Sequence, residues 1–182
     1  MIYDLSLRTV GIIAGAFLIA MSLPGLLKPD LAAVAQRFPR SRLAGVVLLT
    51  VDLVWTLLLL ATMEMGEFSG FRKPLLVILP VGFVLVLRFV EEFLSVRALG
   101  ILCLLAAEPL LDAAFLRHET SRLFVTVFAY LLIIAGLFWV AIPYLLRDQI
   151  NWSARNAVRW RVLNGIALSY GIVILSFTFT RY

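Results

Sequence analysis

Three acidic residues lie inside long apolar runs, where a carboxyl group is the kind of side chain that binds a proton or a cation. Asp52 lies in the run LLTVDLVW, and Glu108 and Asp112 lie in LLAAEPLLD. A charged residue at the centre of a membrane helix costs about 2.5–3.5 kcal/mol on insertion scales, so such residues usually face a partner, a cavity or a pathway. The three acids are therefore the first candidates for a functional site.

Glu108 and Asp112 are four residues apart, which places them on one face of a helix. Pro109 removes a backbone hydrogen bond beside Glu108 and predicts a kink there. Glu108 also lies near the depth expected for Asp52. This pattern predicts a kinked helix whose two acids line a polar cavity or bind a cation.

Arg88, Glu91, Glu92 and Arg97 form a second charged cluster. If one helix continues through it, Arg88 can pair with both acids, at spacings of three and four residues. Two interpretations of the charged residues stay open. In one, the three midplane acids form a proton or cation relay with Arg88 or Arg97 as counter-charge. In the other, the charges only pair helices, each worth about 0.6–2 kcal/mol.

The inventory of reactive residues excludes several chemistries. The chain has one cysteine, Cys103, and one histidine, His118, so it forms neither an internal disulfide nor a multi-histidine metal or haem site. Phosphate-loop, dinucleotide-binding and nucleophile-elbow motifs are absent from the sequence. We expect no metal and no cofactor. Enzyme activity is the weakest interpretation, limited to acid catalysis by Asp52 with Glu108.

The composition identifies the environment that these residues need. Of 182 residues, 63% are hydrophobic and 15% are charged, against roughly 45–50% and about 25% in soluble domains. Spanning a membrane takes about 20 apolar residues per helix, and the apolar runs are too long for barrel strands. We expect an all-α, polytopic membrane protein with one domain over 1–182 and six spans, at Thr9–Leu27, Leu43–Met63, Pro74–Val90, Ala98–Leu116, Leu123–Leu146 and Val162–Thr178.

Two connectors have the apolar spacing of short helices in the membrane interface, over 30–38 and 149–160, with an ordinary polar loop as the alternative. Trp152 and Trp160 suit the aromatic belt at the membrane surface. Gly11 and Gly15 form a G-x-x-x-G pattern in the first span, which permits close contact with another helix or another subunit.

The basic residues predict an orientation. The positive-inside rule places in the cytoplasm the side with more Lys and Arg, which holds Lys28, Arg37, Arg40, Arg42, Arg88, Arg97, Arg147, Arg155, Arg159 and Arg161. The other side holds Arg8, Arg72, Lys73, Arg117, Arg122 and Arg181. Six spans then leave both termini outside, and we expect a bacterial-type inner membrane. The net charge of +5 fits anionic lipid headgroups, and we expect no nucleic-acid partner.

The sequence leaves two functions open. One is a small transporter or channel, whose midplane acids form a proton or cation site reached by a water-accessible cavity. The other is a structural or accessory subunit of a larger membrane complex, in which the buried charges pair helices. The expected partners are the lipid bilayer and either further copies of the chain or other membrane subunits.

Overall fold

The computed structural model describes residue 3 and residues 5–28, 30–90, 92–115 and 117–180. All regular structure in these ranges is helical. In chain order the elements are α1 (Leu7–Leu27), α2 (Leu31–Arg37), η1 (Phe38–Arg40), α3 (Arg42–Thr62), η2 (Gly66–Phe71), α4 (Arg72–Phe89), α5 (Leu94–Ala114), α6 (Arg122–Ala141), α7 (Tyr144–Ala154) and α8 (Ala157–Thr180), with η for short 3-10 helices.

Six helices are long and apolar enough to cross a membrane: α1, α3, α4 together with η2, α5, α6 and α8. This confirms the predicted all-α architecture, and it fits a multi-pass membrane protein. The short helices expected in two connectors are present as α2 and α7. Serine side chains begin two of the spans, because Ser6 accepts a hydrogen bond from the Thr9 amide at 3.1 Å and Ser41 accepts one from the Ala44 amide at 3.2 Å.

The structure corrects the boundaries near residue 150. The fifth span was expected to reach Leu146, but α6 ends at Ala141 because Pro143 follows and cannot continue the helical hydrogen bonding. The connector helix expected over 149–160 instead runs from Tyr144 to Ala154. A new helix then starts, and the Asn156 side chain accepts a hydrogen bond from the Val158 amide at 2.8 Å.

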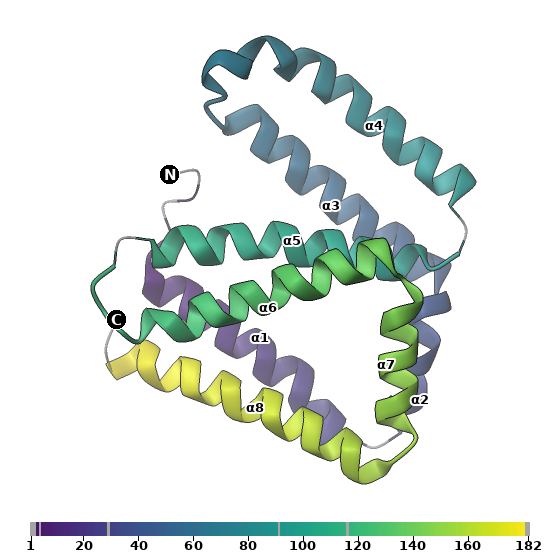
Figure 1. The fold of residues 1–182 in the computed structure, drawn as a ribbon, viewed down its shortest axis with the longest axis vertical. Coiled ribbons are helices and arrows are strands. Elements are labelled where there is room, and N and C mark those ends of the chain that lie inside the picture. Colours follow the sequence, from purple (N-terminus) through teal and green to yellow (C-terminus); the bar gives the residue numbers. More distant parts are fainter. Residues whose placement is uncertain (1–2, 4, 29, 91, 116, 181–182) are drawn as a thin grey trace.

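Two pairs of antiparallel helices pack closely through glycines, α1 with α8 and α5 with α6 (Figure 1). A Cβ atom added at Gly136 would lie 2.7 Å from the Gly100 carbonyl oxygen, and one at Gly15 would lie 3.0 Å from the Gly171 carbonyl oxygen. Gly11 also faces α8, at Thr178. Close backbone approach at such crossings is the usual way in which membrane helices associate, since lipid supplies no hydrophobic driving force.

The hairpin of α3 and α4 leans away from these pairs (Figure 1). α3 packs on α5 at Gly45, where an added Cβ atom would lie 2.8 Å from the Ser95 backbone nitrogen. Both helices begin at this crossing and run in the same direction. α4 packs mainly on α3 and has no buried residue.

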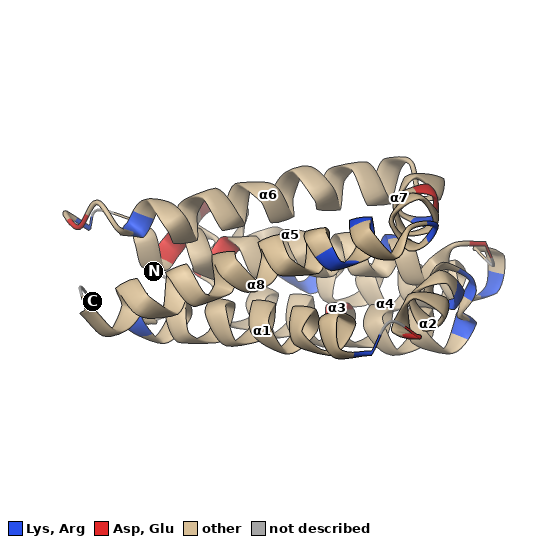
Figure 2. Cartoon of the chain, turned by 90° about the horizontal axis from the view of Figure 1, so that it is seen from below, with Lys and Arg blue, Asp and Glu red and all other residues tan. Residues whose placement is uncertain are grey.

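The helices α2 and α7 lie side by side across one end of the bundle (Figure 1). Trp160 at the start of α8 donates a hydrogen bond from Nε1 to the Gly25 carbonyl oxygen at 2.8 Å, which ties the two long helices together there. Lys and Arg gather at this end, and the chain termini lie at the opposite end (Figure 2). We call the end with α2 and α7 the basic end.

Candidate functional site

Asp52 is enclosed where α3 packs on α5. The residue is 3% exposed, and α3 packs along α5. Within the part of the chain that the structure describes, neither oxygen of the Asp52 carboxyl group has a hydrogen-bond partner. A buried carboxylate without a partner is costly. The group is therefore placed to bind a proton or a small cation, which removes that cost.

One helical turn beyond Asp52, a hydrogen bond joins α3 to the N-terminal segment. The Trp55 indole Nε1 donates to the Tyr3 hydroxyl oxygen at 2.6 Å. The same hydroxyl faces the Glu108 carboxyl group of α5. Burial raises the pKa of the Tyr3 hydroxyl above its usual value of 10.0, while the bond from Trp55 acts in the opposite direction. Tyr3 stays protonated at neutral pH and is available to both neighbours.

Glu108 and Asp112 line a groove of about 540 Å³ between α5 and α6. The other lining residues are apolar, namely Leu104, Ala107, Leu111, Phe115 and Ile133. One oxygen of Asp112, Oδ2, is buried without a hydrogen-bond partner among the described residues. α5 continues as a single helix through Pro109, so the two acids do share one face, as their spacing predicted.

These polar residues come from α3, α5 and the segment that precedes α1. We call Asp52, Trp55, Tyr3, Glu108 and Asp112 the acidic track. It starts at the buried crossing of α3 and α5, passes through the N-terminal segment and ends in the groove beside α6. Sequence reasoning found the three acids but missed Tyr3 and Trp55. No local signal marks that pair, because the residues are 52 positions apart.

The second predicted cluster is not assembled as expected. α4 ends at Phe89, so helical spacing no longer relates Arg88 to Glu92, and the backbone of Phe93 turns into the left-handed region at φ 55°. Arg88 and Glu92 are exposed, and Arg97 has a buried Nε without a partner in the described ranges. Glu91 lies outside the described residues. The single ion pair found among the described residues joins Arg147 to Asp148 at 2.8 Å.

The two tryptophans proposed for the membrane surface lie at the basic end. Trp152 is exposed, with the Arg159 guanidinium 4.8 Å from its ring centre, and Trp160 bonds Gly25 as described above. Over the described residues, no group of three or more His, Cys, Asp or Glu side chains is arranged to hold a metal ion.

The function has to be inferred from this geometry and chemistry. Comparisons with protein-family models, with curated proteins and with solved structures find no match to this chain.

Proposed function

We propose that the protein is a small membrane transporter or channel in which the acidic track carries protons or a small cation. The observation that carries the proposal is the Asp52 carboxyl group, which is buried at a helix crossing and has no partner for either oxygen in the described part of the chain. In a membrane such a group is a candidate member of an ion or proton pathway.

The alternative role for the acids, pairing of helices, requires partners. Across the described ranges the one ion pair lies in α7, between two adjacent residues, and none joins two spanning helices. Asp52 gains no pairing energy that would offset its burial. The lack of partners within these ranges therefore favours proton or cation binding over structural pairing.

The rest of the track supplies a route. Tyr3 is a hydroxyl group that both accepts and donates hydrogen bonds, and it lies between Trp55 and Glu108. Glu108 and Asp112 continue the line into the groove beside α6. A proton or cation that leaves Asp52 would pass Trp55 before it meets the Tyr3 hydroxyl and then the carboxyl groups of Glu108 and Asp112, on its way toward the end of the bundle that holds the termini.

The orientation follows from the distribution of basic residues. We place the basic end in the cytoplasm, because Lys and Arg gather there (Figure 2) and the positive-inside rule relates such a bias to the cytoplasmic side. Both termini and the groove of Glu108 and Asp112 then face the outside. A bacterial-type inner membrane is the setting that we propose.

The test is ion flux into liposomes that contain the purified protein. A trapped pH-sensitive dye reports protons and a trapped sodium indicator reports Na⁺, while a potassium gradient with valinomycin supplies the driving voltage. We expect flux in one of the two assays. Asp52→Asn should abolish it, and Glu108→Gln should reduce it by about tenfold or more, because each removes an ionisable oxygen from the route.

Asp148→Asn is the matched control, since it makes the same chemical change at an exposed acid of α7 outside the track. Its flux should equal that of the unmodified protein. Flux no greater than in protein-free liposomes, or equal flux in Asp52→Asn and the control, would contradict the proposal.

A structural or accessory subunit is the second candidate function, and α4 is the observation that favours it. The helix has no fully buried residue, and it exposes large apolar side chains along its length, including Val77, Val81, Val84 and Phe89. This surface suits another membrane subunit or a second copy as well as lipid. Native mass spectrometry after gentle extraction would show a fixed set of other subunits if this function is correct.

A further inference from the structure

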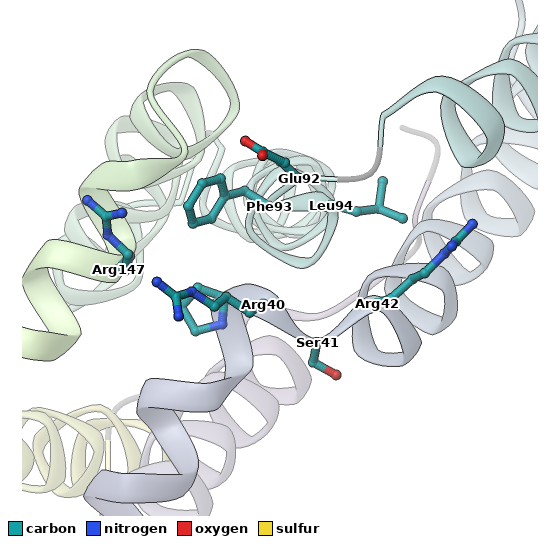
Figure 3. Close-up of a pocket in the computed structure, with 8 residues that line it drawn as sticks. Arg40, Ser41, Arg42, Glu92, Phe93, Leu94 and Arg147 are labelled. Atoms are coloured by element: carbon teal, nitrogen blue, oxygen red, sulfur yellow. The ribbon is translucent and has the colours of Figure 1, made fainter.

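A cavity opens at the basic end, at a distance along the bundle from the acidic track. It has a volume of about 430 Å³, which lies within the usual range for small-molecule sites. Its walls come from parts of the chain that are far apart in sequence (Figure 3): η1, the start of α3, the turn between α4 and α5, and α7. The lining residues are Pro39, Arg40, Ser41, Arg42, Glu92, Phe93, Leu94 and Arg147.

Charged side chains make up half of the lining. Three of its residues are arginines, and Glu92 is the one acid among them. Arg40 extends toward Phe93 and Arg147, whereas Arg42 points away from them (Figure 3). Arg40 is exposed and forms no ion pair among the described residues. Its guanidinium is thus free to bind an anion.

Arg147 is held in a defined position. Its Nε and Nη2 atoms contact Asp148 Oδ1 at 2.9 and 2.8 Å, and its guanidinium lies 5.7 Å from the centre of the Phe93 ring. These contacts use one edge of the guanidinium and one face of the ring. The remaining donor atoms of Arg147 are left for a ligand.

The wall opposite is also fixed. Buried Ser95 donates a hydrogen bond from Oγ to the Phe38 carbonyl oxygen at 2.8 Å, which ties the start of α5 to η1. Gly45 lets α3 approach the same turn closely. A site whose walls are already rigid loses less conformational entropy when a ligand binds. The arginines therefore project from a rigid frame.

We propose that this cavity binds a phosphate group, either in the headgroup of an anionic lipid or in a phosphate-bearing solute. Arginine forms paired hydrogen bonds to phosphate oxygens, and Arg40 carries a positive charge that no ion pair among the described residues neutralises. Its place at the basic end puts the cavity at headgroup level. The proposal is independent of the acidic track, and neither depends on the other being correct.

Native mass spectrometry of the full chain with added lipid tests the lipid source. Phosphatidylglycerol supplies an anionic headgroup, and phosphatidylcholine supplies the same phosphate with a compensating positive charge. We expect phosphatidylglycerol to be retained preferentially. Arg40→Gln should weaken retention by about tenfold, and Arg40→Gln with Arg147→Gln should weaken it further, since hydrogen bonds to charged groups are lost.

Arg37→Gln is the matched control. Arg37 is an exposed arginine in the last turn of α2, at the same end of the bundle, and it does not line the cavity. Retention in this variant should stay within twofold of that in the unmodified protein. Because Arg40 is exposed, the single variant should fold normally, which circular dichroism will check.

Calorimetry of lipid-depleted protein with inorganic phosphate tests the second source. Heat that disappears in Arg40→Gln but not in Arg37→Gln, without preferential lipid retention, supports a phosphate-bearing solute. Preferential lipid retention that is sensitive to Arg40→Gln supports a headgroup. The proposal is overturned if neither ligand binds, or if Arg37→Gln and Arg40→Gln weaken binding equally, since general surface charge then explains the attraction.

Discussion

The two close helix pairs and the α3–α4 hairpin have similar compositions but pack very differently. In α1·α8 and α5·α6, glycines lie where the backbones cross, and little room is left for even a Cβ atom. In the hairpin, α4 contains Gly82, yet nothing lies within 4 Å of the position where its Cβ would be. The difference shows that a glycine in a membrane helix matters when a second backbone faces it.

Polar side chains of the acidic track lie where these two regions meet. α3 packs on α5, and Asp52 is buried at this contact. Beyond it, the hydrogen bond from Trp55 to Tyr3 ties α3 to the segment that precedes α1. Two kinds of contact thus hold the tilted hairpin, the close approach of α3 to α5 at Gly45 and the hydrogen bond from Trp55 to Tyr3.

The largest loss of stability should come from adding a side chain where two helix backbones approach most closely. Gly136→Leu places a side chain against the Gly100 carbonyl oxygen, which is 2.7 Å from the ideal Cβ position, so α5 and α6 must separate. We expect a loss of about 3 kcal/mol in the free energy of unfolding. Thermal unfolding in detergent measures it. Gly82→Leu in α4 is the control, and an equal loss there would show that the contrast between the two regions is wrong.

Removing the partly buried hydrogen bond between the regions should have the next largest effect. Tyr3→Phe deletes the oxygen that accepts the bond from Trp55 and leaves the indole N–H without that partner. We expect about 1–2 kcal/mol of destabilisation. Because the folded pKa of Tyr3 is raised, the unfolded chain holds fewer protons in alkaline solution. Stability should therefore stay level below pH 10 and fall above it, and Tyr3→Phe should lack this fall.

For Asp52, where the two regions meet, we expect a substitution to raise the free energy of unfolding. Asp52→Asn replaces a carboxyl group that has no partner in the described ranges with a neutral amide that costs less to bury. The free energy of unfolding should rise by about 1 kcal/mol even though flux is lost. Chemical unfolding of both proteins at neutral pH measures the difference. A decrease of that size would instead indicate that Asp52 pairs two helices, and the accessory-subunit function would gain support.

Ser95→Ala should lower the free energy of unfolding by about 1 kcal/mol, since it removes the hydrogen bond from Ser95 to the Phe38 carbonyl oxygen, which joins α5 to η1. The same thermal assay applies. Ser176→Ala is the control, because Ser176 is exposed on α8 and bonds only within its own helix. If both substitutions lower the free energy of unfolding equally, the hydrogen bond between α5 and η1 adds nothing to stability.

The smallest expected effect is an increase in stability. Gly82→Ala adds a methyl group in open space and removes the entropic cost of a helical glycine, so we expect about 0.5–1 kcal/mol of stabilisation. Gly100→Ala, the same change in a close pair, should destabilise instead, since its Cβ would lie 2.9 Å from the Gly136 carbonyl oxygen. If the two substitutions shift the thermal midpoint in opposite directions, the contrast between the hairpin and the close pairs is supported. Shifts in the same direction contradict it.

Most of the helical architecture could be predicted from the sequence, because long apolar runs and polar breaks reflect local physical constraints. The six spans and both short helices were expected. The errors are at ends such as Ala141, where a proline stopped α6 inside an apolar run and hydropathy alone gave no boundary.

The sites were harder to predict because they depend on which helices meet. Asp52, Glu108 and Asp112 were found by their chemistry, but Tyr3 joins them only in three dimensions. The lining of the basic cavity was missed as well. Arg40 and Arg147 are far apart in the chain, and only the packing of α2 and η1 near α7 brings them to one cavity.

The pairing of the first long helix with the last has a consequence for biosynthesis. The contact between Trp160 and Gly25 joins residues 135 positions apart. A ribosome adding about 5–20 residues per second needs on the order of ten seconds to make that stretch. During this interval α1 is already in the bilayer without its final partner, and its glycine face is uncovered. Until α8 arrives, that face depends on lipid, on the insertion machinery or on a temporary neighbour.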